Sequence, residues 1–317
     1  MHSLKRVFDL GEESGVLRSS IAVTMCIATF GLGFGLLSGS FSIMFDGVYS
    51  LIDASMSLLA LAVVNLIHTY TDSAASSRFL RERFTVGFWH LEPIALGLNG
   101  VLLIGVSGYA FFNAVTILLD GGHELEFGFA IIYAIITVIA CTTAALMEMR
   151  ANRRIKSQFI ALDIRSWIMS GSITAALLIA FCIGYGVTGT RFEWIARYID
   201  PAVLALVCLI IIPLPIGTVK QAFSDILLVT PPELKAHVDD VARMAVKSHD
   251  FQSYRAYVAK VGRAQQIELY FIVPSSAPTR TIKQWDAIRD SIGKAIGPDN
   301  PDRWLTIVFT GDMEWAE

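Results

Sequence analysis

Long, almost uninterrupted apolar segments alternate with short polar ones from residue 17 to residue 220. A helix needs about 20 mainly apolar residues to cross the hydrocarbon core of a bilayer. Six segments are therefore predicted as transmembrane helices: residues 17–39, 41–67, 93–119, 127–148, 160–184 and 199–220. In the first segment Gly31, Gly35 and Gly39 recur at four-residue spacing. This spacing either lets another helix approach closely or reflects only how common glycine is in membrane helices.

The sequence becomes more polar after Pro231-Pro232. Residues 233–248 predict an amphipathic helix opened by proline, and two alternating runs at 254–260 and 266–273 predict strands. A polar helix around 280–295 and a strand at 304–309 complete an αββαβ order. This order predicts a small α+β, ferredoxin-like domain with helices on one face of a sheet. The predicted organisation is an N-terminal segment 1–16, a six-helix transmembrane domain 17–220, a hinge 221–230 and a cytoplasmic C-terminal domain 231–317.

The composition supports an α-helical membrane protein. Of the 317 residues, 54% are hydrophobic and only 17% are charged, and the mean hydropathy is +0.56. Soluble domains contain less apolar and more charged sequence. The net charge of -3 comes without a long basic run, so no nucleic acid partner is expected. No nucleophile elbow, HExxH pair or phosphate loop is found in the sequence, so the protein is not expected to be an enzyme.

Basic residues gather in alternate loops between the predicted spans. Cytoplasmic loops of membrane proteins carry an excess of Lys and Arg, which sets the orientation. One set of loops contains only Arg191 and Arg197. The other set and the N-terminal segment contain ten basic residues: Lys5, Arg6, Arg18, Arg78, Arg81, Arg83, Arg150, Arg153, Arg154 and Lys156. Both termini are therefore predicted to be cytoplasmic.

Two of the predicted spans carry polar stripes. The stripes share the spacing i, i+3, i+7, which places their members on one helical face: Asp46, Tyr49 and Asp53 on the second span, and Asp163, Ser166 and Ser170 on the fifth. Carboxylates inside a membrane are costly and are functional candidates by default. If the two faces meet, they form an oxygen-lined site suited to a hard or borderline divalent cation.

Other roles are open for several of these residues. Asp46 and Asp163 could instead cap or brace helices near their ends, where charge is less costly than at the centre. Ser166 and Ser170 are weak signals alone, because serine often bonds back to its own helix. The deeper position of Asp53 favours a functional role.

Three segments together resemble the cation diffusion facilitator family. Residues 40–53 (SFSIMFDGVYSLID) are similar to the signature of its second span, and residues 84–100 (FTVGFWHLEPIALGLNG) to its entry into the third. Residues 221–231 (QAFSDILLVTP) resemble its hinge into a soluble tail. The resemblance covers nearly the whole chain and agrees with the order of six spans followed by an αββαβ tail.

The resemblance implies a multi-pass exporter in the plasma or inner membrane. Members of the family export divalent metals such as zinc, iron, manganese or cobalt, usually in exchange for protons, as homodimers. Their two HxxxD-like ligand pairs fall here on Tyr49 with Asp53 and on Ser166 with Ser170, and Asp163 matches an aspartate that often precedes the second pair.

The histidines of both pairs are missing here, and no histidine of the chain lies within the middle of a span. An all-oxygen site shifts the expected substrate from zinc toward manganese, iron or magnesium. Protons would be carried by Asp53 together with Asp46 or Asp163. No tightly bound cofactor is expected.

A second interpretation is a paralogue that no longer transports and serves as a scaffold or heterodimer partner. The absence of a carboxylate at Ser166 and Ser170 favours this interpretation. The retention of Asp53 within the membrane argues against it.

Overall fold

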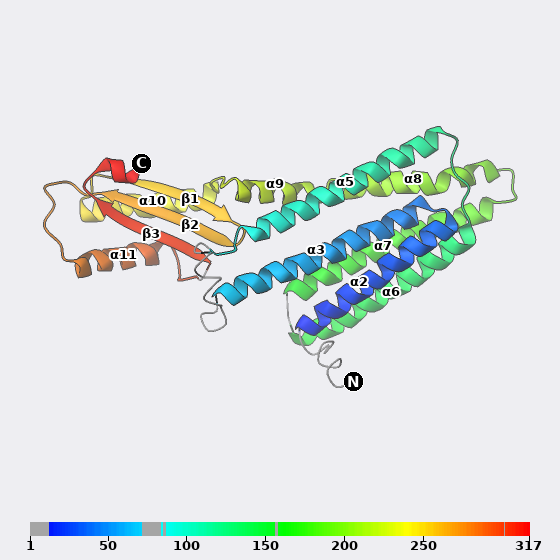
Figure 1. The fold of residues 1–317 in the computed structure, drawn as a ribbon, viewed down its shortest axis with the longest axis horizontal. Coiled ribbons are helices and arrows are strands. Elements are labelled where there is room, and N and C mark those ends of the chain that lie inside the picture. The colour runs from blue at the N-terminus through cyan, green and yellow to red at the C-terminus, as the bar shows by residue number, and fades with distance from the viewer. Residues whose placement is uncertain (1–12, 72–83, 85–86, 156–157, 301) are drawn as a thin grey trace. The chain divides into compact units, whose positions relative to one another are not determined.

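The structure, a computed structural model, describes residues 13–71, 84, 87–155, 158–300 and 302–317 (Figure 1). Contacts divide the chain into two units, Met1–Leu59 with Leu98–Gly217, and Ala60–Gly97 with Thr218–Glu317. Several residues used to predict the orientation lie outside the described part of the chain: Lys5, Arg6, Arg78, Arg81, Arg83 and Lys156. The same holds for most of the predicted N-terminal segment 1–16.

Long apolar helices make the chain an integral membrane protein. They are α2 (Glu13–Ser38), α3 (Phe41–Thr71), α5 (Leu91–Leu119), α6 (Phe127–Ile155), α7 (Gln158–Val187) and α8 (Glu193–Ile211). Among the described residues, five stretches are long and apolar enough to span a membrane: Gly15–Ser38, Leu91–Leu119, Phe127–Ile155, Asp163–Val187 and Glu193–Ile226. Helix α3, with 31 residues, is not one of these five. A total of six spans therefore stays a prediction.

The predicted span 199–220 lies within the apolar stretch Glu193–Ile226, but its helix is interrupted by a turn. Helix α8 begins earlier, at Glu193, and ends at Ile211, and α9 (Ile216–Ile226) follows after a turn. Pro213 and Pro215 lie in that turn, and proline lacks the amide hydrogen that would continue the helix. Pro201, inside α8, frees the carbonyl of Arg197 four residues earlier, and this oxygen accepts a hydrogen bond from the His123 amide at 2.9 Å.

Glycines allow close contact between α2 and α3. A Cβ at Gly35 would lie 2.8 Å from the amide nitrogen of Met44, and one at Gly31 would lie 3.0 Å from the Cα of Gly47. Atoms at these distances overlap, so only glycine permits this approach. The close-approach interpretation is confirmed for both residues. Gly39 instead has φ +70° beyond the end of α2, where the chain turns into α3.

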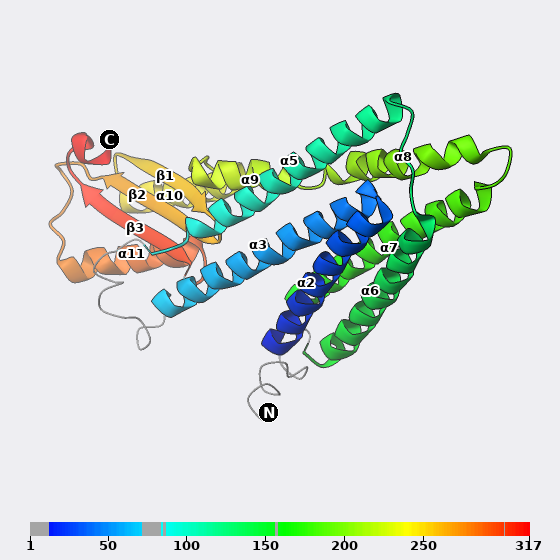
Figure 2. The ribbon, with the colours of Figure 1, turned by 45° about the vertical axis from the view of Figure 1, so that its right-hand side comes forward.

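Apolar clusters join the helices of the first unit. Ala130, Tyr133 and Ala134 of α6 pack against Leu177 and Phe181 of α7, and α2 runs beside this pair (Figures 1 and 2). A separate cluster joins α3 to α5 and α8, through Phe45, Ala110, Ala114, Leu204 and Cys208. Helix α3 thus has one side toward α2 and another toward α5 and α8.

The C-terminal part of the second unit has the predicted αββαβ order. Its elements are α10 (Pro232–His249), β1 (Ser253–Val261), β2 (Ala264–Ile272), α11 (Ile282–Ile296) and β3 (Arg303–Thr310), followed by a short 3₁₀ helix, η1 (Met313–Ala316). The sheet order is β1-β2-β3, with β1 antiparallel and β3 parallel to the central β2. The core lies between this sheet and the helices α10 and α11, around Val238, Ala242, Ile267, Leu269, Phe271 and Ile292.

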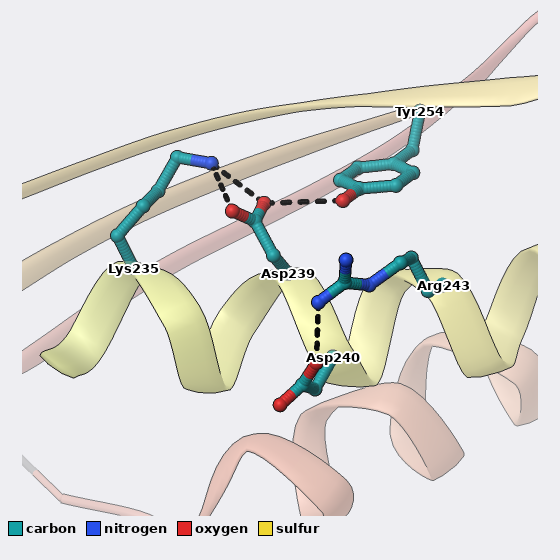
Figure 3. A network of polar contacts seen from close by, with 5 residues as sticks. All are labelled: Lys235, Asp239, Asp240, Arg243 and Tyr254. Carbon is teal, nitrogen blue, oxygen red and sulfur yellow. Dashed lines mark hydrogen bonds and ion pairs between the residues drawn. The ribbon is translucent and has the colours of Figure 1, made fainter. Parts of the chain in front are cut away.

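Polar contacts along α10 join this helix to β1 (Figure 3). Lys235 Nζ lies 2.5 Å from Asp239 Oδ2, and the Tyr254 hydroxyl donates to Asp239 Oδ1 at 3.3 Å. Partial burial and the Asp239 carboxylate raise the pKa of Tyr254. Arg243 pairs with Asp240 one turn earlier on the outer side of the helix. These contacts hold the first strand against the helix.

The second unit also contains an ion pair between α5 and the β1–β2 hairpin. Arg263 Nε lies 2.9 Å from Glu92 Oε2, and Glu92 belongs to the first turn of α5. Gly262, with φ +60°, forms the hairpin turn close to Pro93. The hydrogen bond to Glu92 raises the pKa of Arg263.

Candidate cation site

A cavity of about 130 Å³ lies among the helices of the first unit. All of the residues predicted for the cation site line it: Asp46, Tyr49, Asp53, Asp163, Ser166 and Ser170. Helices α3 and α7 therefore meet with their polar stripes facing one space. Thr24 and Ile27 of α2 and Leu204, Val207 and Ile211 of α8 complete the lining.

The α3 side of the cavity carries two aspartates with different surroundings. Asp46 Oδ2 accepts a hydrogen bond from the Tyr133 hydroxyl at 2.6 Å, and Tyr133 on α6 is fully buried. This contact braces α3 against α6, as one interpretation of Asp46 proposes, while the residue still lines the cavity. Asp53, two turns further along α3, is half-buried and also lines the cavity, beside Tyr49 and Ser50.

The α7 side supplies one carboxylate and two hydroxyls. Asp163 is half-buried, and Ser166 follows it by three residues on the same face. The Ser170 hydroxyl lies 3.9 Å from the thiol sulfur of Cys141 on α6. The Trp167 ring also lines the cavity and is only 6% exposed, so it narrows this space.

The acidic residues that line the cavity are Asp46, Asp53 and Asp163. Among the residues that line the cavity, Asp53 comes from α3 and Asp163 from α7. Within the described part of the chain, no three His, Cys, Asp or Glu side chains lie close enough to hold one metal ion. A cation here would be held by a few carboxylate oxygens together with hydroxyl oxygens, which suits hard divalent cations.

Helix α6 contributes a row of buried polar residues that the sequence reasoning missed. Tyr133, Thr137, Cys141 and Glu148 are 0%, 1%, 1% and 5% exposed. Three of them contact polar residues that line the cavity: Tyr133 contacts Asp46, Cys141 contacts Ser170, and Glu148 contacts Trp167. The signal in the sequence is their spacing of four, four and seven residues.

Asp200 on α8 was also missed, and its role is structural. This aspartate is 2% exposed and accepts hydrogen bonds from the Ser40 hydroxyl at 2.6 Å and the Phe41 amide at 2.9 Å. It also accepts from the Ser42 amide at 3.4 Å. The first amides of α3 have no partner within their own helix. A carboxylate from α8 therefore caps the helix that carries Asp53.

Comparison with known proteins agrees with this architecture. Residues 17–227 match the cation efflux transmembrane domain. The chain is also 25% identical over 230 residues to a protein of Pectobacterium atrosepticum named zinc transporter ZitB. That match covers 70% of this chain and 65% of the relative's length. Because the cation efflux domain spans most of the chain, including every residue of the cavity, the protein belongs to the cation efflux, or cation diffusion facilitator, family.

Proposed function

We propose that the protein is a secondary transporter that exports a divalent metal cation from the cytoplasm. The observation that carries this proposal is the cavity among the membrane helices, which is lined by half-buried carboxylates from both α3 and α7. Charged groups in such a place are costly, and where they are present they mark pathways for ions or substrates. The name of the relative, a zinc transporter, agrees with a metal cation as the substrate.

In this proposal Asp53 and Asp163 bind the cation, and Tyr49, Ser166, Ser170 and Asp46 supply further oxygens. Two carboxylates balance the charge of one divalent ion. When the ion leaves, protons that bind the same carboxylates restore neutrality, which gives proton antiport. With oxygen ligands alone, manganese, iron and magnesium fit better than zinc, because zinc sites usually include histidine or thiolate.

The proposed setting follows from the sequence. Six spans would place both termini in the cytoplasm. The protein would lie in the plasma or inner membrane as a homodimer. The transmembrane domain would extend over 17–220 and a hinge over 221–230, which includes the end of α9 and Leu228 with φ +56°. The soluble domain 231–317 would stabilise the dimer. Alternating access would move the site-bearing helices against the others.

The test is metal flux into proteoliposomes under an imposed pH gradient, with manganese, iron, zinc, cobalt, cadmium and magnesium. We expect one or more of these metals to be transported and expect Asp53→Ala to abolish the flux. Asp120→Asn is the matched control, because Asp120 is exposed at the end of α5 and outside the cavity. Its flux should equal that of the wild type.

A folded, dimeric protein without flux for any metal would overturn the transporter proposal. That outcome would favour the paralogue that serves as a scaffold or heterodimer partner. The structural feature that favours this second function is the α7 face of the cavity, where hydroxyls occupy both positions of the ligand pair, at Ser166 and Ser170.

A further inference from the structure

Glu148, near the end of α6, is buried among polar groups next to the cavity. Its side chain is 5% exposed, although charged residues are almost never buried without partners. Oε1 accepts a hydrogen bond from the indole nitrogen of Trp167 at 3.1 Å, and the same nitrogen lies 3.0 Å from the Ser20 hydroxyl. Trp167 lines the cavity, so Glu148 lies directly behind its wall.

The second oxygen of Glu148 is the unusual feature. Oε2 is buried and accepts no hydrogen bond from any group of the described residues. A buried acceptor without a donor costs about 1–3 kcal/mol, and more for a charged group. Native proteins contain few such atoms, and each one calls for an explanation such as a bound ion.

Asp200, another buried carboxylate of the first unit, shows the contrast. Both oxygens of Asp200 accept hydrogen bonds, from Ser40, Phe41 and Ser42. Both oxygens of this carboxylate therefore serve to hold α3 against α8. Glu148 has the burial of a structural carboxylate but only half of the hydrogen bonds.

Asp163 is a charged neighbour of Glu148. The two carboxyl groups are within hydrogen-bonding reach, and their charges act on each other. Two adjacent carboxylates in a buried place repel strongly unless something positive lies between them. Asp163 belongs to the cavity lining, whereas Glu148 lies behind that lining, so Asp163 links Glu148 to the cavity.

We propose that Glu148 is a further ligand of the transported cation, forming with Asp163 a two-carboxylate binding position at the α6–α7 side of the cavity. This proposal rests on the proposed function. It supplies the carboxylate that α7 lacks at Ser166 and Ser170, from a different helix. The position takes a divalent cation that prefers oxygen, and α6 becomes the third helix of the cation pathway, beside α3 and α7.

The test measures Mn²⁺ binding to the full-length protein in lipid nanodiscs, by the electron paramagnetic resonance signal of free Mn²⁺. We expect Glu148→Gln and Asp163→Asn each to weaken Mn²⁺ binding roughly tenfold or more, since even indirect partners of a metal contribute 10–100-fold. The double variant should lose less than the sum of the two effects, because both residues hold the same ion.

The variant Glu148→Gln distinguishes a role of Glu148 in cation binding from a role in holding Trp167. The glutamine oxygen can still accept the bond from Trp167, so a purely structural role predicts unchanged affinity. Glu193→Gln is the matched control, because Glu193 is an exposed glutamate of α8 outside the cavity, and its Mn²⁺ affinity should equal that of the wild type. A thermal melt of each variant shows whether it is folded.

The outcomes keep the two proposals apart. If Glu148→Gln binds and transports like the wild type while Asp53→Ala abolishes flux, the role of Glu148 is wrong and the transporter stands. Additive losses in the double variant would also contradict a shared ion. If the wild-type protein neither binds Mn²⁺ nor transports any metal, the proposed function fails, and the role of Glu148 fails with it.

Discussion

The buried carboxylates of this protein differ in what their oxygens contact, and this difference separates structural residues from candidate ligands. Asp200 receives donors on both oxygens, Asp46 receives one from Tyr133, and Glu148 receives one from Trp167. Asp53 lines the cavity. A carboxylate whose hydrogen bonds are complete has little capacity left for a cation, whereas one with free oxygens can bind it.

Replacement of Asp200, which lies within α8 and caps the start of α3, should destabilise the protein. Asp200→Ala leaves the amides of Phe41 and Ser42 without their acceptor. We expect a loss of about 2–4 kcal/mol, combining the loss of a helix cap with that of charge-assisted hydrogen bonds. The measurement is reversible unfolding in mixed micelles.

Asp200→Asn provides the graded comparison. The amide keeps one oxygen acceptor but gives up the other, so its stability should lie between those of Asp200→Ala and the wild type. Equal stability of Asp200→Ala and the wild type would contradict the capping role.

Helix contacts in the first unit depend on small residues where backbones touch and on polar residues where side chains meet. The α2–α3 contact uses Gly31, Gly35 and Gly47, whose missing side chains let the two backbones meet. The α6–α7 contact combines an apolar cluster with the pairs Cys141–Ser170 and Glu148–Trp167. Both kinds of contact are typical of membrane helices, where lipid offers no hydrophobic drive for association.

Gly35→Ala should disturb the α2–α3 contact, and Gly33→Ala should not. A Cβ at Gly35 would overlap the backbone of Met44, whereas a Cβ at Gly33 meets nothing within 4 Å. Gly33 lies on the same helix, so both variants gain the same helix propensity of about 1 kcal/mol. We expect Gly35→Ala to melt at lower temperature than the wild type, and Gly33→Ala at the same temperature or higher. Equal melting of the two variants would contradict the packing.

The two units differ in the kind of core that stabilises them. The first consists of apolar helices with many exposed large hydrophobic side chains, as expected for surfaces in contact with lipid. The C-terminal domain has its own core between α10, α11 and the sheet, and a polar network on α10 (Figure 3). The apolar surface of the first unit requires a bilayer, whereas the core of the C-terminal domain is closed from water as in a soluble domain.

The orientation of the chain can be tested with single cysteines. In a variant without the four native cysteines, Asp120→Cys and Lys294→Cys each place one thiol at an exposed position. If both termini are cytoplasmic, an impermeant maleimide added to intact cells should label Asp120→Cys and leave Lys294→Cys unlabelled until the membrane is opened. The reverse labelling would overturn the orientation that the basic loops predict.

Much of the architecture could be predicted from the sequence because it depends on local rules. Apolar segments of the length of a bilayer predicted the membrane helices, and alternation predicted the first two strands of the C-terminal domain. The spacing i, i+3, i+7 placed Asp46, Tyr49 and Asp53 on one face of α3, which does line the cavity. Periodicity decides such questions because a residue's face follows from its position along a regular helix.

Contacts between distant segments could not be predicted in the same way. The role of Glu148 depends on its hydrogen bond from Trp167, and the role of Asp200 depends on its hydrogen bonds from the start of α3. In both cases the partner is distant in the sequence. The end of α8 at Ile211 depended on two prolines inside an apolar stretch, whose hydropathy alone suggested one helix. Local periodicity determines which face of a helix is polar, but only the packing of helices decides which donors each buried carboxylate meets, and therefore whether it caps, braces or binds.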